Sequence, residues 1–177
     1  MMEHESSSRT QRISDSNIGW PSDWSARISG DACSLCEAGR PDDDGFGIRI
    51  FEGQYADAYL QRARVQKGYT KVIWRGRHVV EPTDLSDEES AWYWREVLLV
   101  ARALQRYYQP LKMNYEILGN VEPHLHTHLV PRYVRDPAAG QPFPVPIDVD
   151  DLPAIPEDEL RQEAFALRSK LDQIHSR

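Results

Sequence analysis

Three histidines alternate with other residues in one short segment, HLHTHLV at residues 124–130. Side chains of a β-strand point to opposite faces in turn, so a strand here has two unlike faces. Leu125, Thr127 and Leu129 form one face, and the other carries three imidazoles, from His124, His126 and His128. Neutral imidazole binds zinc or copper, and an imidazole that titrates near neutral pH acts as a nucleophile or an acid–base group. The alternative is a polar strand face without chemistry.

Other short runs of β-branched and aromatic residues are bounded by Gly or by charged residues, which is typical of strands. The first three runs follow one another without an intervening helical pattern, and the turn-forming Gly119-Asn120 separates the last two. The predicted strands cover residues 47–51, 56–62, 70–74, 113–118 and 124–130.

Two helices are predicted. Ser86 and Glu89 have the spacing of a capping box, and the helix that they open ends before Pro110. Pro156 opens a second helix near the C-terminus. Each helix has an apolar stripe at helical spacing, formed by Trp94, Val97, Leu98, Ala101, Leu104 and Tyr108 in the first and by Leu160, Ala164, Leu167, Leu171 and Ile174 in the second.

Strands in runs favour an α+β fold over a parallel doubly wound one. We therefore predict an antiparallel sheet of about five strands, with one long helix between the third and fourth strands and a C-terminal helix. The 177 residues suit one domain. Residues 1–30 are expected to form a flexible tail, residues 31–177 the domain, and the proline-rich residues 136–156 a wrapped or mobile loop.

Charge and hydropathy exclude some functions. The net charge of −7 argues against general nucleic-acid binding, which relies on a basic surface. No apolar stretch approaches the ~20 residues of a membrane helix, and the polar N-terminus lacks the apolar core of a signal peptide. The expected protein is cytoplasmic, with no membrane partner and a small-molecule substrate.

The two cysteines, Cys33 and Cys36, have C-x-x-C spacing, which suits a metal half-site, a redox pair or residues without a role. A redox pair needs a strand before it and a helix after it, and the surrounding GDACSLCEAGRPDDD reads as a loop. Zinc is the favoured interpretation. A half-site needs two further ligands, and away from the termini the histidines are His78 and those of residues 124–130.

Residues 124–130 resemble the signature of the histidine triad (HIT) nucleotide hydrolases and transferases, His-φ-His-φ-His-φ-φ with φ apolar, in which Thr127 is the one departure. Further segments match the family: Leu118-Gly119-Asn120 upstream, Lys67-Gly68-Tyr69 and Arg77-His78-Val79 around one predicted strand, and residues 84–89 at the start of the long helix. The resemblance covers about residues 33–134, and the terminal helix fits as well.

The resemblance implies α+β architecture and covalent catalysis at the α-phosphate of a nucleotide conjugate. The middle histidine, His126, would attack phosphorus and form a nucleotidyl-histidine, and His128 would contact the phosphate or leaving-group oxygens. Asn120 is the candidate donor to those oxygens. Gln61 and Asn114 match substrate-contacting positions, although Asn114 also suits a polar strand end.

In one branch of this superfamily, a structural zinc is held by two cysteines, a histidine after the third strand and the first histidine of the triad. Cys33, Cys36, His78 and His124 match that pattern. Such a closed site organises the fold and does not catalyse. The resemblance also implies a homodimer, paired through the long helix and its neighbouring strand.

Three alternatives remain open. The chain can be a nucleotide-binding sensor or interaction module with little turnover, although an intact nucleophile position favours an enzyme. It can be a zinc hydrolase that uses the three triad histidines as ligands, although alternate strand residues lie ~7 Å apart. Residues 61–80 carry six cations and no acid, which either attract an anionic substrate or form a solvated face: Arg62, Arg64, Lys67, Lys71, Arg75 and Arg77.

Overall fold

The computed structural model describes residues 19–144 and 152–175. Five strands form one sheet in the order β1-β2-β3-β5-β4, and each pair of neighbours is antiparallel. The predicted α+β fold is confirmed. The strands are β1 Gly47–Glu52, β2 Ala56–Gln61, β3 Thr70–Trp74, β4 Lys112–Glu116 and β5 His126–Arg132.

The long helix α4, Asp87–Tyr108, lies between β3 and β4, and α5, Glu157–His175, follows β5. Ser86 and Glu89 form the predicted capping box, and Gln109 in the left-handed region ends α4 just before Pro110. Shorter elements precede these helices: α2 Trp24–Ser29, α3 Ser34–Glu37 and the 3₁₀ helix η1 Pro82–Asp84.

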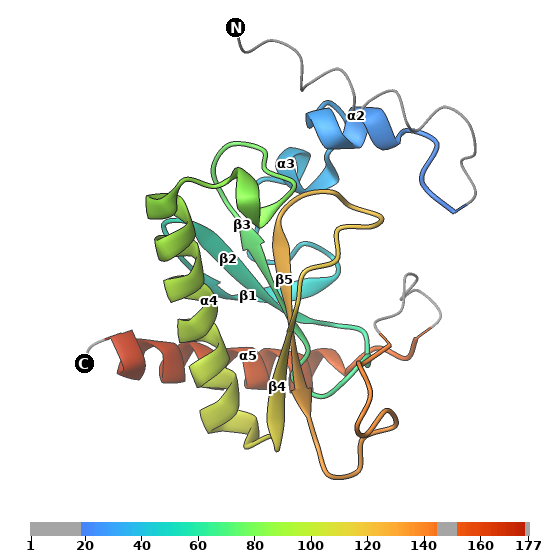
Figure 1. Ribbon diagram of the computed structural model, residues 1–177. Coiled ribbons are helices and arrows are strands. Elements are labelled where there is room, and N and C mark those ends of the chain that lie inside the picture. The colour runs from blue at the N-terminus through green and yellow to red at the C-terminus, as the bar shows by residue number, and fades with distance from the viewer. Residues whose placement is uncertain (1–18, 145–151, 176–177) are drawn as a thin grey trace, which may run out of the picture.

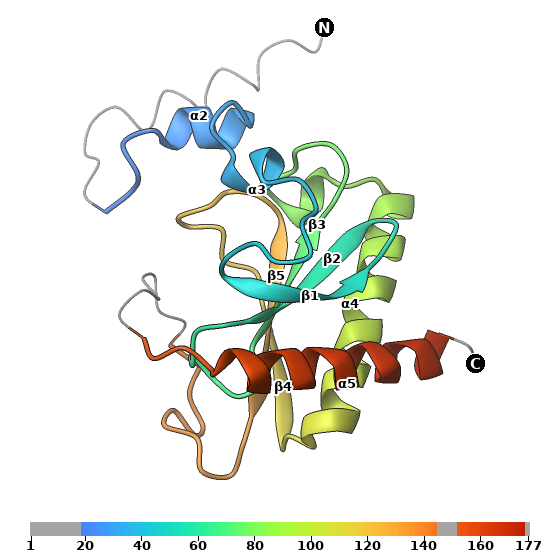
Figure 2. The same cartoon turned by 180° about the vertical axis from the view of Figure 1, so that it is seen from behind.

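Both long helices cover the same face of the sheet (Figures 1 and 2). The Tyr93 hydroxyl on α4 lies 2.8 Å from Oγ1 of Thr127 on β5, and it donates to the carbonyl of Val72 at 3.2 Å. The apolar stripe of α5 joins the same core through Leu160, Ala164, Leu167 and Leu171. Figure 2 shows α5 crossing beside β1, where Arg168 donates to the carbonyl of Arg49.

The opposite face of the sheet carries the histidines, because His126 and His128 alternate with Thr127. Directly paired residues on neighbouring strands share a face. Lys71 on β3 pairs with His128, and so does Glu116 on β4. We call this surface the histidine face; it comprises Tyr59, Gln61, Lys71, His126, His128, Asn114 and Glu116.

The strand boundaries correct one expectation. β5 begins at His126, so His124 lies in the preceding loop and does not share a strand face with the other two histidines. The cause is a change of partner: the Leu125 N–H donates to the carbonyl of Val79, which belongs to the loop after β3. β4 ends at Glu116, two residues before the predicted end.

Of the segment predicted as a flexible tail, residues 1–18 lie outside the described residues, and α2 occupies residues 24–29. Of the predicted proline-rich loop, residues 145–151 are also outside the description. Its described part reaches the sheet, where the Ile155 N–H donates to the carbonyl of Arg62 at 2.8 Å. No described helix is long and apolar enough to cross a membrane.

Candidate functional site

Four potential metal ligands converge at the end of the sheet: Cys33, Cys36, His78 and His124, whose ligand atoms all lie within 4.8 Å of one another. The short helix α3 brings the two cysteines together, because Cys33 is its N-cap and accepts from the N–H of Cys36 at 3.4 Å. His78 follows β3, and His124 precedes β5. The chain thus assembles the four residues from three separate segments.

The distances in this cluster fit a tetrahedral zinc ion. Nδ1 of His124 lies 3.3 Å from Sγ of Cys33 and 3.5 Å from Sγ of Cys36, and Nδ1 of His78 lies 3.5 Å from Sγ of Cys36. Zinc bonds of ~2.3 Å to sulfur and ~2.0 Å to nitrogen place the two ligand atoms ~3.5 Å apart. The donor set therefore suits a closed Cys₂His₂ site.

Both histidines of the cluster are oriented by their second nitrogen. Nε2 of His78 donates to the carbonyl of Ile28 at 3.1 Å, and Nε2 of His124 donates to the carbonyl of Trp74 at 2.9 Å. Because a carbonyl only accepts, the proton resides on Nε2 and the lone pair of Nδ1 faces the sulfurs. This arrangement is typical of metal-bound histidine.

Cys33 does not fit the redox interpretation. Burial raises the pKa of the Cys33 thiol to about 12, whereas a redox-active cysteine has a lowered pKa. Glu122 lies beside the cluster, accepts a hydrogen bond from Ser34 Oγ at 2.8 Å and has a second buried oxygen without a partner. Oε2 of this half-buried Glu122 also lies 3.8 Å from Nη1 of Arg27, so the carboxylate already has a cation beside it.

The second histidine of the triad has a defined tautomer. Nδ1 of His126 lies 2.6 Å from the carbonyl of His124, so Nδ1 carries the proton and donates it to that oxygen. The lone pair is then on Nε2. Burial lowers the pKa of His126 to about 4, so the ring is neutral at neutral pH. His126 thus has the protonation state that a nucleophile requires.

The third histidine has the opposite tautomer. The Tyr69 hydroxyl lies 2.5 Å from Nδ1 of His128. Burial raises the pKa of Tyr69, so the phenol keeps its proton and donates it to Nδ1. Burial also lowers the pKa of His128, to about 3, so its ring is neutral and the one proton is on Nε2. His128 therefore offers an N–H donor, and its ring lies 4.7 Å from that of His126.

The predicted substrate-binding residues lie at different places. Gln61 is buried at the end of β2, on the histidine face, and Asn114 is half-buried on β4, on the same face. Nδ2 of Asn114 donates to Oε1 of Glu116 at 3.2 Å. Asn120 is exposed in the loop between β4 and β5, and within the described residues no hydrogen bond joins it to His126 or His128.

Sequence reasoning missed Tyr69 and Lys71 as members of the site. In the sequence, Tyr69 is only part of a segment that precedes a strand, and Lys71 is only one of six cations. The alternation of side chains along β3 is the sequence signal that could have identified both residues. It puts residues 69, 71 and 73 on one face, and the register of β3 with β5 makes that face the one of His128.

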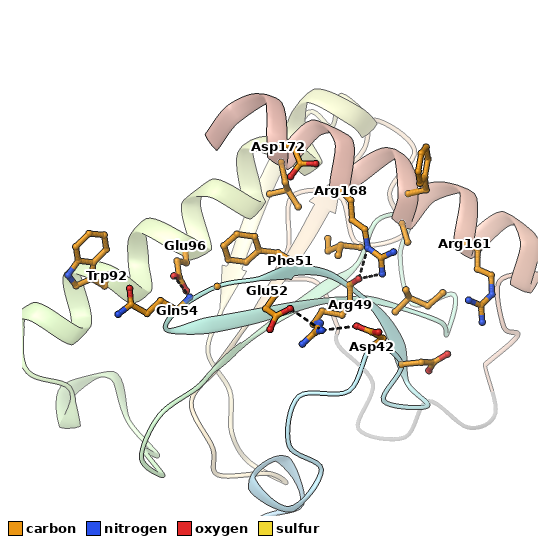
Figure 3. A pocket seen from close by; sticks show the side chains of 17 residues that line it. Asp42, Arg49, Phe51, Glu52, Gln54, Trp92, Glu96, Arg161, Arg168 and Asp172 are labelled. Carbon is orange, nitrogen blue, oxygen red and sulfur yellow. Dashed lines mark hydrogen bonds and ion pairs between the residues drawn. The ribbon is translucent and has the colours of Figure 1, made fainter. Parts of the chain in front are cut away.

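A large groove lies away from the histidines, between β1, α4 and α5 (Figure 3). Its volume is about 1230 Å³, and Figure 3 labels Phe51, Trp92, Arg161 and Arg168 along it. Arg161 and Arg168 already have partners, Glu157 and the carbonyl of Arg49. The 17 lining residues include none of the predicted site residues, so the groove does not define the chemistry.

Comparison with known proteins gives a consistent result. Residues 48–135 match the model of the HIT domain. The structure is similar to a histidine triad protein from Bradyrhizobium japonicum, with a TM-score of 0.64 and 26% identity over 79% of this chain and 98% of that one. It is also similar to a zinc-bound histidine triad family protein from Mycobacterium smegmatis, with a TM-score of 0.54 and 26% identity over 86% and 94% of the two chains.

A curated relative has a named activity. A bis(5'-adenosyl)-triphosphatase from Saccharomyces cerevisiae is 27% identical over 89 residues, which are 48% of this chain and 43% of the yeast protein. This chain spans at most 66% of the length of the curated relatives that it matches.

Proposed function

The chain contains a HIT domain, and from this we propose that it is a nucleotide hydrolase or nucleotidyltransferase that acts at the α-phosphate of a nucleotide conjugate. Two kinds of substrate are dinucleoside polyphosphates and nucleoside phosphoramidates. The opposite tautomers of two neighbouring neutral histidines carry this proposal. His126 offers a lone pair that can attack phosphorus, and His128 offers an N–H donor to the oxygens around it.

In the first step, Nε2 of His126 attacks the α-phosphorus. A bond between nitrogen and phosphorus forms, and the bond from phosphorus to the leaving group breaks. The Nε2–H of His128 donates a hydrogen bond to the leaving group, which departs as an anion or, where it is an amine, takes its proton from solvent. The carbonyl of His124 accepts from Nδ1 of His126 and stabilises the positive charge that develops on the ring.

In the second step, water or another acceptor attacks the nucleotidyl-histidine. The attacking water loses its proton to solvent, the bond between His126 and phosphorus breaks, and the Nε2–H of His128 donates to the phosphate oxygens. With water as the acceptor, the product is a nucleoside monophosphate, His126 returns to its neutral form, and His128 keeps its tautomer throughout. Gln61 and Asn114, on the same face, are proposed to bind the substrate, and Asn120 is proposed to donate to the phosphate or leaving group.

Zinc is proposed as a structural ion held by Cys33, Cys36, His78 and His124. When bound, it would cross-link the N-terminal segment to the loops that flank β3 and β5, and it would take no part in the chemical steps. His126 and His128 are not part of this group of ligands, which disfavours a zinc hydrolase that uses all three triad histidines.

The test is release of nucleoside monophosphate from diadenosine triphosphate, an adenosine phosphoramidate, adenylyl sulfate and a nucleotide sugar, with wild type and His126→Ala compared. Turnover that disappears in the variant, together with a phosphorus adduct of one nucleotidyl mass in rapidly quenched wild type, supports the mechanism. Bound nucleotide without turnover of any conjugate supports the alternative, a nucleotide-binding sensor or interaction module.

A further inference from the structure

Lys71 lies in the middle of the histidine face. On β3 it pairs directly with His128 of β5 on one side and with Tyr59 of β2 on the other. Cβ atoms of directly paired residues lie about 5 Å apart. The long side chain of Lys71 therefore shares the surface on which His126 and His128 present their reactive nitrogens.

The ammonium group of Lys71 has no partner within the described part of the chain. No carboxylate lies within 4.0 Å of it, and no hydrogen bond is formed by it. Asp44 and Glu122 attract Lys71 from a greater distance. An oxygen of Asp44 already accepts from the N–H groups of Phe46 and Gly47, at 2.9 and 2.7 Å, and Oε2 of Glu122 accepts from Ser34 at 2.8 Å.

The other five cations of residues 61–80 differ in this respect. Each has a partner in the structure: Arg62 pairs with Asp43 and Glu157, Arg64 with Glu159, Arg75 with Asp57 and Arg77 with Glu89, and Lys67 lies over the ring of Tyr108. Lys71 alone of the six is half-buried on the histidine face without a partner, and burial lowers its pKa. A desolvated ammonium without a counter-ion is unfavourable, which an anion bound beside it would relieve.

We infer that Lys71 is a substrate-binding residue, whose ammonium pairs with a phosphate oxygen of the nucleotide conjugate held against His126 and His128. The inference rests on the proposed function and adds a residue to it. Ile73 of β3 pairs with His126 in the same way, but its side chain is apolar and cannot pair with a phosphate oxygen.

The experiment compares AMP with adenosine, because the two ligands differ only in the phosphate and neither is turned over. Binding to the full-length protein is measured by calorimetry for wild type, Lys71→Met, Lys71→Arg and the control Lys67→Met. Lys67 is a lysine of the same stretch that lies against Tyr108 of α4. Met keeps the length of the side chain and removes an unpaired charge, so Lys71→Met is expected to fold with an unchanged or raised melting temperature.

The expected result is a loss of AMP affinity of about 10- to 100-fold in Lys71→Met, the range of one charge-assisted hydrogen bond. Adenosine affinity stays the same, Lys71→Arg restores most of the AMP affinity, and Lys67→Met binds both ligands as wild type does. Equal weakening of AMP and adenosine, or no weakening of either, would overturn the inference, and so would a wild type that binds neither.

Nucleoside monophosphate release, measured in parallel on the same four proteins, separates this inference from the proposed function. Wild-type turnover that Lys71→Met leaves unchanged in KM and kcat overturns the role of Lys71 and leaves the function standing. A Lys71-dependent preference for AMP in a protein that turns over no conjugate supports the role of Lys71 and contradicts the enzyme.

Discussion

The hydroxyl of Tyr69 lies 2.5 Å from Nδ1 of His128, and the two rings are stacked at an interplanar angle of 7°. Tyr69 is 2% exposed and His128 5% exposed, so water does not compete for this contact. Since the phenol is the donor, the hydrogen bond selects the tautomer of His128 that carries its proton on Nε2. A residue just before β3 thus sets the proton position of a residue on β5.

Tyr69→Phe is expected to lower kcat by about 10- to 100-fold, because the N–H donor of His128 to the developing negative charge is no longer held in place. The ring still packs on His128, but the tautomer that donates from Nε2 is no longer selected. KM should change little, since the substrate contacts remain. Steady-state kinetics check the split, and ¹⁵N NMR of the His128 ring reports the tautomer. An unchanged kcat with an unchanged tautomer would refute the role of Tyr69.

The stability of the protein is expected to depend on His128 between pH 7 and pH 5. Burial lowers the pKa of His128 to about 3, with smaller effects from His126 and Lys71, against about 6.5 in the unfolded chain. The folded state therefore excludes a proton that the unfolded state binds. Stability is present in full above pH 6.5 and falls as the pH drops towards 3, by about 1 to 2 kcal/mol at pH 5.

Urea unfolding of wild type and His128→Gln at pH 7, 6 and 5 isolates this effect. The charged and titratable groups that face His128 are Lys71 and Tyr69 from the β3 side, Glu116 on β4 and His126 on β5 itself. All are common to both proteins, so the difference in slope belongs to His128. Parallel pH dependence in the two proteins would contradict the prediction.

Zinc removal is expected to destabilise the protein. The purified chain should contain one zinc per molecule, and a chelator or Cys33→Ser should lower the melting temperature by several degrees, because the cluster joins three segments. Elemental analysis and thermal unfolding check this. Ser34→Ala, between the two cysteines, is the control and should keep its zinc. A metal-free protein with the same melting temperature as a zinc-loaded one would rule out the structural role.

A buried cluster of ion pairs is expected to stabilise the part of the molecule around the cysteines, independently of the zinc site. Asp57 on β2 is fully buried, and its oxygens lie 2.6 Å from Nη2 of Arg40 and 3.0 Å from Nε of Arg75. Arg75 also donates to the carbonyl of Leu35, between the two cysteines, at 3.1 Å. Asp57→Asn removes the charge between two arginines and should cost about 3 to 5 kcal/mol of unfolding free energy.

The matched comparison for this ion pair is Asp42→Asn. Asp42 pairs with Arg49 at 2.7 Å, but its side chain is 84% exposed, so the loss should stay below about 1 kcal/mol. Urea unfolding of both variants measures the contrast. Similar losses in the two variants would mean that burial does not govern the strength of these pairs.

Homodimer formation remains a prediction from the resemblance, and the structure indicates a suitable surface. β4 is an edge strand, and exposed apolar side chains lie on it and beside it: Leu111, Tyr115 and Leu118 are 75%, 39% and 46% exposed. Unpaired edge strands readily pair with another chain. Sedimentation should show twice the chain mass, and Tyr115→Lys should shift it towards one chain. A single-chain mass for wild type at micromolar concentration would contradict the dimer.

The fold was largely accessible from the sequence. Strand positions follow from alternation within a few residues, and α4 follows from the capping box at Ser86 and the stop before Pro110. These signals are local, so neighbours in the chain suffice to read them. The cysteine spacing indicated a metal half-site, and the resemblance to the HIT family implied the other two ligands; the structure brings all four together.

The protonation state of the site depended on tertiary structure. From alternation alone, His124 is predicted to share a face with the other two histidines. In the structure, Leu125 bonds to the carbonyl of Val79, and His124 lies beside Cys33. Tyr69 and His128 are 59 positions apart in the chain, and the pairing of β3 with β5 brings them into contact. The same pairing leaves Lys71 unpartnered beside His128. Residue types and local periods are properties of the amino-acid sequence. Burial and the hydrogen-bond partner of each ring nitrogen exist only after the strands have paired, because residues distant in the chain supply the partners and the cover.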